Sequence, residues 1–410
     1  MPLPYTNWAG NIRFGAARTH RPTTVEQLQE LVAASPSARA LGSGHSFSPI
    51  ADTPGDLIQL DALPHTVQID PANQVVTVSA AVAYAELAAR LDKEGFALPN
   101  LASLPHISVA GACATGTHGS GNSNGSLATA VIALDMVSAD GSLVTTDRRA
   151  ADFPGMVVAL GALGIVTSMT LRVEPAFTVR QWVYEGLSRE QLVTHVEEIF
   201  AAAYSVSVFT DWRHASRIWV KQRDGDPVPP PHWLGALQAT EPRHPVPGMP
   251  AGSATQQLGR PGPWHERLPH FRPEFTPSSG DELQSEYLVP RDRAADAITA
   301  LTGIADQIAP VLLIAEIRTV AADDLWLSMA YGRDSVAFHF TWRPDTGAVR
   351  PVLAQLEERL APFDPRPHWG KLFTMDPRGS YDRLPGFTGL MERYDPAGTF
   401  RNDFIARSIG

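Results

Sequence analysis

The sequence has 410 residues, of which 44% are hydrophobic and 19% are charged. These are ordinary values for globular proteins, so they exclude a disordered or fibrous chain, and the length is typical of two domains. The formal net charge is −10 and no block of lysine or arginine occurs, so nucleic acid is excluded as an expected partner.

A single cysteine, Cys113, excludes an intrachain disulfide framework and a cysteine-based zinc cluster. The chain begins MPLPYTNWAGNIRF, which lacks the charged start and apolar run of a signal peptide. No later run of about 18 apolar residues occurs. We therefore expect a cytoplasmic protein with no membrane partner.

The first third of the chain predicts short helices and strands in alternation. Thr23 and Glu26 form a capping-box pattern, which predicts the start of a helix. Within 131–147, Asp140-Gly141 joins two β-rich runs and predicts a tight hairpin turn. Further strands are predicted at 38–41, 57–60, 66–70, 74–80 and 164–175, and a further helix at 84–93.

The pattern changes at about residue 178. Residues 226–277 are rich in proline and show no periodicity, and we interpret them as an ordered, irregular covering segment in which Trp233, Trp264 and Phe271 are packed. Helices are predicted at 189–204, 293–308 and 352–360, and strands at 206–212, 217–223, 282–290, 312–320 and 335–342. The mixture indicates the α+β class.

The segment Leu41–Ser48, LGSGHSFS, follows a predicted strand and consists mostly of small residues. Such residues let successive N–H groups point into one concavity, which binds a pyrophosphate without basic side chains. The segment is not a Rossmann fingerprint, since Phe47 stands where a third glycine is expected, nor a P-loop, since no lysine follows. The alternative interpretation is a tight surface turn.

A second segment, 103–121, is also dominated by small residues, which indicates that a flat or extended group lies close to its backbone. A competing hypothesis is that His45, His106 and His118 converge as metal ligands. None of these three histidines has a closely spaced His or Glu partner on the same predicted helix, so we expect no metal.

Two predicted strands in the second half carry polar pairs two residues apart, and each pair therefore shares one strand face. The pairs are Glu316 with Arg318 and His339 with Thr341. They could line a cavity, or form an ion pair on the solvent face of a half-exposed sheet. Lysine occurs only three times, and Lys371 lies between aromatic residues, where a partly desolvated ammonium would indicate function.

These motifs together resemble the vanillyl-alcohol-oxidase type of flavoprotein and, within it, the alditol oxidases. The resemblance covers essentially the whole chain. It is carried by TNWAGN (6–11), LGSGHSFS, LPNLASLPHISVAGACATGTHGSG (98–121), LGALGIVTS (160–168), PGPWHERLPHFRPEFTPSSG (261–280), AEIRTVAAD (315–323), AYGRDSVAFHFTW (330–342) and RPHWGK (366–371).

The resemblance implies an α+β, two-domain fold of the vanillyl-alcohol-oxidase or PCMH type: an FAD-binding domain at 1–176, an inserted mixed α/β substrate domain at 177–370, and a C-terminal segment, 371–410, that completes the FAD domain. It also implies that FAD is covalently attached through His45. Cys113 does not align with the cysteine that forms a second link in some relatives. The expected FAD-binding residues are Ala40, Leu41, Gly42, Ser43, Gly44, His45, Ser46, Ser103, Ser108, Gly111, Thr115, Gly116, Thr117, His118 and Ile165.

For the substrate, the resemblance implies that an alditol such as xylitol or sorbitol is oxidised at its terminal primary hydroxyl to the aldose, with hydride passing from C1 to flavin N5 and O2 reduced to hydrogen peroxide. The expected substrate-binding residues are Ser103, Glu316, Arg318, Thr341 and Lys371. Arg318, Lys371 and His339 are the expected catalytic residues. Arg318 stays protonated and would stabilise developing alkoxide, while His339 or Lys371 would accept the proton.

Relatives of this type are commonly monomers, and we expect the same here. An alternative function is an aldonolactone oxidase or dehydrogenase of the same fold. A third is a non-enzymatic carbohydrate- or flavin-binding protein, which the density of polar groups aimed at one centre argues against.

Overall fold

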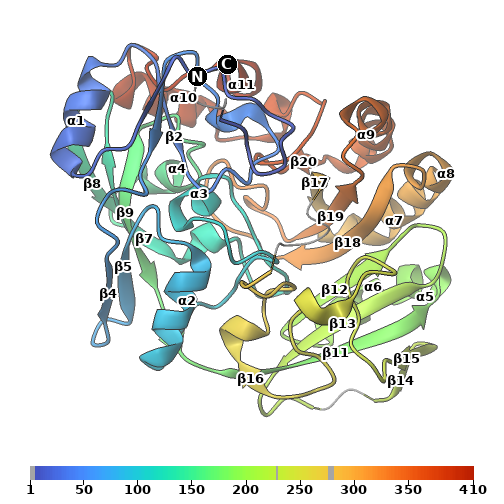
Figure 1. Ribbon diagram of the computed structural model, residues 1–410. Helices are drawn as coiled ribbons and strands as arrows, with labels where there is room; N and C mark the ends of the chain where they lie inside the picture. The colour runs from blue at the N-terminus through green and yellow to red at the C-terminus, as the bar shows by residue number, and fades with distance from the viewer. Residues whose placement is uncertain (1–4, 228–229, 276–280) are drawn as a thin grey trace.

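The computed structural model describes residues 5–227, 230–275 and 281–410, and these fold around two large β-sheets with helices packed on them (Figure 1). The α+β class predicted from the sequence is confirmed. None of the helices in these ranges combines the length and the apolar character that crossing a membrane requires.

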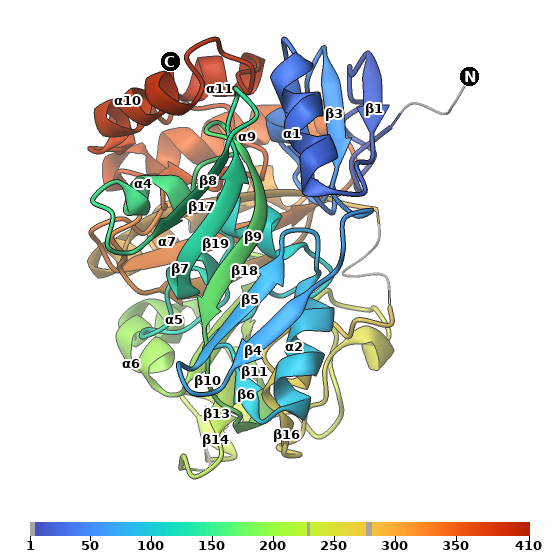
Figure 2. The same ribbon diagram turned by 90° about the vertical axis from the view of Figure 1, so that its left-hand side faces the viewer.

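The N-terminal part contains a small parallel sheet and a five-stranded antiparallel sheet (Figure 2). The parallel sheet has the order β1 (Arg18–His20), β3 (Asp56–Gln59), β2 (Ala38–Leu41), and helix α1 (Val25–Ala34) connects β1 to β2. The antiparallel sheet has the order β4 (Val67–Asp70), β5 (Val75–Ser79), β9 (Ile165–Arg172), β7 (Val131–Val137), β8 (Leu143–Asp147).

Helix α2 (Tyr84–Lys93) illustrates how this part is held together. Its residues Tyr84, Leu87, Ala88 and Leu91 recur with helical spacing, and all four are buried in one core with the antiparallel sheet. The other elements of this part are α3 (Val109–Ala114), α4 (Phe153–Val157) and the paired strands β6 (Phe96–Ala97) and β10 (Glu174–Pro175).

The second part is built on a ten-stranded sheet. Its order is β14 (His232–Trp233), β15 (Ala236–Gln238), β11 (Thr178–Leu187), β13 (Ser216–Arg223), β12 (Ser205–Thr210), β18 (Leu312–Val320), β19 (Ser335–Trp342), β17 (Leu283–Pro290), β20 (Arg366–Pro367), with β16 (Gly262–Pro263) paired to β11. Five helices follow the strands of this part: α5 (Arg189–Thr194), α6 (Val196–Ala201), α7 (Ala294–Thr302), α8 (Ala305–Ile308) and α9 (Thr346–Leu360).

These five helices cover one face of the large sheet. Phe338, Phe340 and Trp342 of β19 share a buried core with Leu301 of α7 and Leu353 of α9. Because successive side chains of a strand point to opposite faces, the polar residues between these aromatics point away from the helices. That second face is directed toward the N-terminal part of the molecule, and it forms a wall of the site described below.

The chain returns to the N-terminal part at its end. Helices α10 (Leu384–Tyr394) and α11 (Asp403–Ser408) share the core of the antiparallel sheet through Leu390 and Ile405. The guanidinium of Arg39, in the edge strand β2 of the small sheet, donates to the carbonyl oxygen of Phe400 at 2.8 Å. The last residues therefore pack against the first third of the chain.

Three local predictions are corrected by the structure. Helix α1 is capped by Thr24, whose side chain accepts from Gln27 N, and not by Thr23. The single helices predicted over 189–204 and 293–308 are each broken in two. The first break is at His195, whose backbone is non-helical and whose ring bonds Glu198. The second is at Gly303 and Ile304: glycine has poor helix propensity, and the backbone of Ile304 is non-helical.

The prediction for the proline-rich segment is confirmed where the structure describes it, with 228–229 and 276–277 outside the described residues. Trp264 is fully buried and its ring lies 6.2 Å from that of Phe177. Phe271 is also buried, and Trp233 contacts the ring of Tyr184. Three aromatic anchors thus fix a segment that has little regular structure.

Candidate active site

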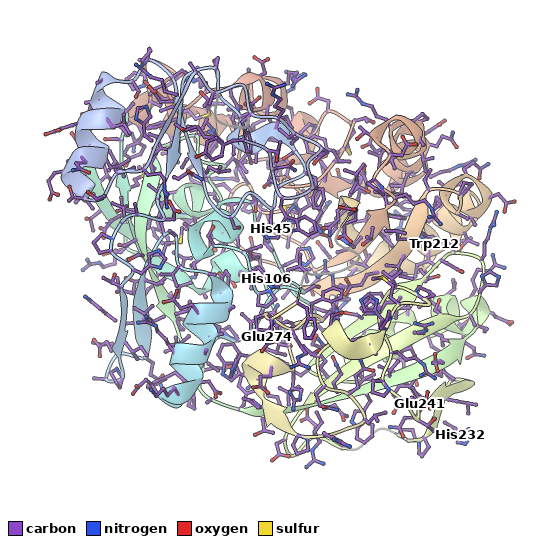
Figure 3. All side chains as sticks on the ribbon, viewed as in Figure 1. His45, His106, Trp212, His232, Glu241 and Glu274 are labelled. Carbon is purple, nitrogen blue, oxygen red and sulfur yellow. The ribbon has the colours of Figure 1, made fainter. Side chains whose placement is uncertain are left out.

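A cavity of about 490 Å³ lies between the N-terminal part and the second face of the large sheet. Its lining includes the small-residue segments near 40–48 and 103–118, four strands of the large sheet and the 368–371 segment. Figure 3 shows His45 and His106 in this central region of the molecule. Segments far apart in sequence therefore form one site.

Most of the site residues expected from the sequence line this cavity. They are Ala40, Leu41, Gly42, Ser43, Gly44, His45, Ser46, Ser103, Ser108, Gly111, Thr115, Thr117, His118, Glu316, Arg318, His339, Thr341 and Lys371. Gly116 and Ile165 are not among the lining residues. Ile165 is buried in the core beneath α1, and a side chain at Gly116 would meet Met329.

The two small-residue segments are in contact, since Ser108 N donates to Ser43 Oγ at 3.2 Å, and the part of the cavity that they line is called the crevice below. A Cβ atom added to Gly42 would come within 2.6 Å of Ser108 Oγ, and one added to Gly111 within 2.7 Å of the same atom. Ser108 Oγ is buried without a hydrogen-bond partner among the described residues. The glycine backbone is open to the cavity, and the Ser108 hydroxyl needs a hydrogen-bond partner. Both features fit a cofactor whose phosphates lie along the crevice.

His45 lies in the same cavity, half-buried, with its ring stacked on Trp8 at a centroid distance of 5.0 Å. Burial lowers the pKa of His45 to about 4, so the imidazole is neutral at pH 7. The preceding residue, Gly44, has a left-handed φ of 69°, and its carbonyl accepts from Trp8 N. This turn places His45 on the wall of the cavity.

The centre of the opposite wall is Glu286, which the sequence reasoning did not select. Its Oε1 lies 2.5 Å from Arg318 Nη2, and its Oε2 lies 2.5 Å from Lys371 Nζ. His118 Nε2 is 3.4 Å from Oε1 and His339 Nδ1 is 3.6 Å from Oε2. A single carboxylate, 1% exposed at its side chain, thus links residues from four segments of the chain.

The strand register explains this grouping. Glu286 of β17 is paired with His339 of β19, which is paired in turn with Glu316 of β18. The three side chains therefore form a row across the sheet on the face turned away from the helices. Gln284, Thr341 and Ile314 form the next row in the same way, and all three line the cavity.

Lys371 reaches this row from the segment that follows β20. Trp369 is fully buried and its indole N–H donates to Leu327 O at 2.7 Å, which fixes the segment. Phe47 N donates to Gly370 O at 2.7 Å, and Ser48 Oγ donates to Trp369 O at 2.6 Å. The sequence motif that contains His45 is therefore bonded directly to the one that contains Lys371.

The charges of the cluster are strongly coupled. Burial alone would raise the pKa of Glu286, but Lys371 and Arg318 hold it well below its usual range. Burial lowers the pKa of Lys371 below its ordinary value, and Glu286 only partly offsets this. Burial also lowers the pKa of His339 to about 4. At pH 7 the cluster therefore contains an ionised carboxylate, a neutral imidazole and a lysine that loses its proton unusually easily.

Hydrogen bonds order the remaining groups of the cluster. Lys371 Nζ is 2.7 Å from His339 Nδ1, and His339 Nε2 is 3.2 Å from Thr341 Oγ1. Arg318 Nη1 donates to Ser103 Oγ at 3.3 Å. Glu316 and Arg318 are each 4% exposed, so the alternative of a solvent-facing ion pair is wrong.

The three histidines of the metal hypothesis do not converge. His106 Nε2 is 2.9 Å from Pro273 O, His118 Nδ1 is 2.9 Å from Gly119 O, and His45 stacks on Trp8. In the described part of the chain no group of three or more His, Cys, Asp or Glu side chains is arranged to hold a metal ion.

Comparison with known proteins agrees with this geometry. Residues 16–147 match the FAD binding domain family, and residues 281–408 match the D-arabinono-1,4-lactone oxidase family. The chain is 52% identical to an alditol oxidase from a Streptomyces strain, with 99% of each chain covered. It is 27% identical to an L-gulono-1,4-lactone dehydrogenase from Mycobacterium tuberculosis, again with 99% of each chain covered.

Among solved structures, cholesterol oxidase from Brevibacterium sterolicum superposes with a TM-score of 0.83 at 16% identity, covering 99% of this chain and 96% of that one. This likeness shows the fold, which is the one predicted from the sequence. FAD is therefore the cofactor that the crevice fits. The chain belongs to the alditol oxidase family, within the FAD-binding flavoproteins of the vanillyl-alcohol-oxidase type.

Proposed function

We propose that the protein is an FAD-dependent alditol oxidase, which converts the terminal CH2OH group of xylitol, sorbitol and similar polyols to the aldehyde of the aldose while O2 is reduced to hydrogen peroxide. The observation that carries this is one cavity wall on which Ser103, Glu316, Arg318, Thr341 and Lys371 come together. The full-length similarity to the Streptomyces alditol oxidase supports the same substrate class.

When bound, FAD supplies the two-electron acceptor for the alcohol and the donor for O2. We propose that the residues of the crevice between Gly42 and Gly111 hold its phosphates, and that His45 carries a covalent bond to the flavin. A neutral imidazole has a free ring nitrogen for such a bond, and the lowered pKa of His45 keeps it neutral. The stack on Trp8 restricts the ring to one orientation.

The substrate hydroxyls would be bound by the rows of polar side chains on the sheet. Glu316, as a carboxylate, accepts hydrogen bonds, while the hydroxyls of Ser103 and Thr341 both donate and accept. Because these groups come from strands and from a segment anchored to strands, they are held rigidly. A flexible polyol is thereby fixed with one terminal carbon at the reaction centre.

Arg318 would stabilise the alkoxide that develops as the substrate hydroxyl loses its proton. Burial alone would lower the pKa of Arg318, but Glu316 and Glu286 raise it, so the guanidinium keeps its charge throughout. Fixed donors aimed at developing charge in a site closed to water are among the largest contributions to catalysis.

The hydroxyl proton would pass through His339 to Lys371. With Lys371 neutral, His339 Nδ1–H donates to Nζ across 2.7 Å, and Nε2, which lies 3.2 Å from Thr341 Oγ1, is the unprotonated nitrogen that would accept the substrate proton. Transfer of the Nδ1 proton then yields a lysine ammonium beside Glu286 Oε2. The lowered pKa of Lys371 makes it a usable base near neutral pH, and Glu286 stabilises the charge that it gains.

We also propose that the domain division runs between residues 176 and 177, with 371–410 returning to the FAD domain. Support comes from the strands: β10 ends at Pro175 in the N-terminal part, and β11 begins at Thr178 in the large sheet.

The second candidate function is oxidation of an aldonolactone. It is supported by the match of residues 281–408 to the D-arabinono-1,4-lactone oxidase family. Peroxide release measured side by side with xylitol and with L-gulono-1,4-lactone separates the two. We expect the higher kcat/KM with xylitol. A higher kcat/KM with the lactone would favour the aldonolactone oxidase over the alditol oxidase. Release of peroxide with neither substrate would favour a non-enzymatic binding protein.

A further inference from the structure

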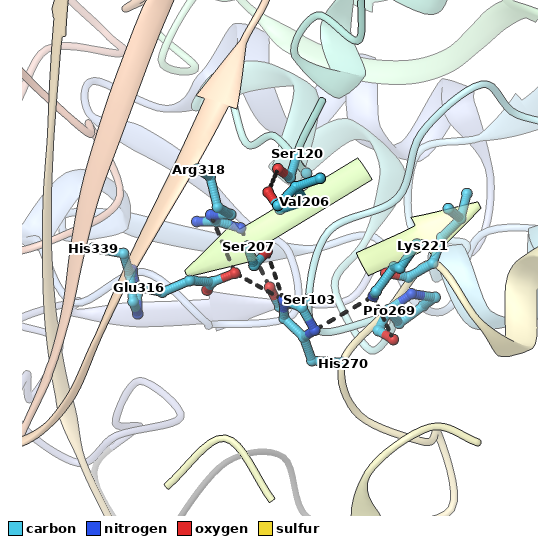
Figure 4. A network of polar contacts seen from close by, with 12 residues as sticks. Ser103, Ser120, Val206, Ser207, Lys221, Pro269, His270, Glu316, Arg318 and His339 are labelled. Carbon is cyan, nitrogen blue, oxygen red and sulfur yellow. Dashed lines mark hydrogen bonds and ion pairs between the residues drawn. The ribbon is translucent and has the colours of Figure 1, made fainter. Parts of the chain in front are cut away.

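Two buried residues that were not expected in the site, Lys221 and His270, form a chain of contacts with Glu316 of the site, and His270 and Glu316 both line the cavity (Figure 4). Lys221 of β13 contacts His270, and His270 contacts Glu316. The Lys221 Nζ to His270 Nδ1 distance is 3.3 Å, and the His270 Nε2 to Glu316 Oε1 distance is 2.7 Å. Lys221 is 1% exposed and His270 is 4% exposed.

The hydrogen-bond pattern fits a protonated Lys221. Lys221 Nζ donates to Leu268 O, to Pro269 O at 3.2 Å and to His270 Nδ1. An ammonium has three N–H donors and no acceptor, so these three acceptors match it fully. Because Nδ1 is then the acceptor, Nε2 of a neutral His270 carries the hydrogen and donates it to the Glu316 carboxylate.

The ring of His270 is held in place on several sides. The rings of Phe209 and Trp219 each lie 5.2 Å away in edge-to-face arrangements. The backbone N–H of His270 donates to Ser103 O at 3.2 Å, so the irregular segment is bonded to a residue of the site. His270 therefore cannot turn to offer the other nitrogen without disturbing its neighbours.

Glu316 contacts His270 and Arg318 through the same carboxylate oxygen, Oε1. His270 Nε2 lies 2.7 Å from Oε1, and Arg318 Nε lies 3.6 Å from the same atom. We propose that Lys221 and His270 are positioning residues that hold the Glu316 carboxylate so that Oε2 accepts hydrogen bonds from the hydroxyls of the polyol. The inference rests on the proposed function and assigns roles within the same site.

The electrostatics agree with this arrangement. Burial lowers the pKa of His270 to about 4, and Lys221 lowers it further, so the ring is neutral at pH 7. Burial lowers the pKa of Lys221 to about 7, which Glu316 opposes and Arg318 reinforces. Burial alone would raise the pKa of Glu316, but Arg318 and His270 lower it. His339 also lowers the pKa of Glu316, so the groups that act on the chain come from β13, β18, β19 and the irregular segment.

A pH effect on substrate binding follows. Below its pKa, Lys221 is an ammonium and His270 donates to Glu316. When Lys221 loses its proton, its lone pair accepts from Nδ1–H, and the bare Nε2 then faces the carboxylate. The KM for xylitol should therefore be low below about pH 7 and should rise as the pH increases above it.

The test compares His270→Ala and His270→Gln with wild-type holoenzyme, using xylitol. Loss of a hydrogen bond to a charged group predicts a KM about 10- to 100-fold higher in His270→Ala, with kcat within about threefold. The amide N–H of Gln is placed to reach Glu316 and should restore most of the KM. His265→Ala, on the same irregular segment and paired with Asp92 at 3.6 Å, is the matched control, with unchanged KM.

Flavin content and the melting temperature show whether each variant is folded. The KM of the wild type, measured from about pH 6 to about pH 9, tests the role of Lys221 and His270 without any substitution. Lys221→Arg, which keeps its charge, should flatten that profile. An unchanged KM in folded His270→Ala would overturn the assignment, as would a fall in kcat at constant KM. A wild type that does not oxidise xylitol would instead refute the proposed function.

Discussion

Glu286 Oε2 lies 2.5 Å from Lys371 Nζ, in a contact that joins β17 to the segment after β20 across 85 residues of sequence. The same carboxylate contacts Arg318, so one buried anion balances two buried cations. Burying a charge is costly unless a partner compensates it. This contact therefore allows a lysine and an arginine to lie together on the wall of the cavity.

Replacing Glu286 with Gln should lower kcat/KM for xylitol by about 100-fold or more, because the cations lose their counter-charge and the ammonium of Lys371 is no longer stabilised. The flavin should stay bound. Steady-state kinetics and the visible spectrum check this. Glu357→Gln is the matched control. Glu357 is a buried glutamate that accepts a hydrogen bond from Tyr287 outside the cavity, so its replacement should lower the melting temperature and leave most of the activity. Equal activity losses in the two variants would contradict the assignment.

The pH dependence of kcat should follow Lys371. Because the base must be deprotonated, kcat should rise as pH rises through the pKa of Lys371, which burial lowers below its ordinary value. Glu286 raises the pKa of Lys371, so Glu286→Gln should move this rise to lower pH. Lys371→Met should abolish the rise together with most of the activity. A kcat that falls as the pH increases would exclude a lysine base.

His45→Ala should release the flavin from its covalent link. After acid precipitation, the yellow colour should stay with the wild-type pellet and pass to the supernatant for the variant. Trp8→Phe keeps an aromatic ring beside His45 and should keep the link, since only the stacking partner changes. Yellow pellets from His45→Ala would place the covalent anchor on another residue.

Gly111→Ala should weaken FAD binding, since the added methyl group would point into the crevice, 2.7 Å from Ser108 Oγ. Gly389→Ala is the control, because nothing lies within 4 Å of a Cβ at that position. The ratio of flavin to protein absorbance measures the outcome. A full flavin complement in Gly111→Ala would show that the crevice does not hold the cofactor.

The strands that carry the site were predictable because their signals are local. β18 and β19 have the bounds predicted from the sequence, and their polar residues two positions apart do share one face, as Glu316 and Arg318 show. Strand β17 was predicted as well, and the positions of Gln284 and Glu286, two residues apart on one strand, could have drawn attention to its polar face.

What the sequence could not supply was the set of partners. Glu286 acquires its role from strand register and from Lys371, and no local pattern encodes either. His270 lies in the irregular segment, where no periodicity assigns a side chain to a face, and its contact with Lys221 spans 49 residues. Residues brought together by tertiary contacts of this kind are the ones that pattern reasoning misses.

The central claim, that the protein oxidises alditols with FAD, is tested most directly by mixing the purified holoenzyme with xylitol in the absence of O2 and following flavin absorbance. We expect the absorbance to bleach, and readmission of air to restore it with release of one hydrogen peroxide per aldose formed. A flavin that stays oxidised with xylitol and sorbitol but bleaches with L-gulono-1,4-lactone would contradict the claim.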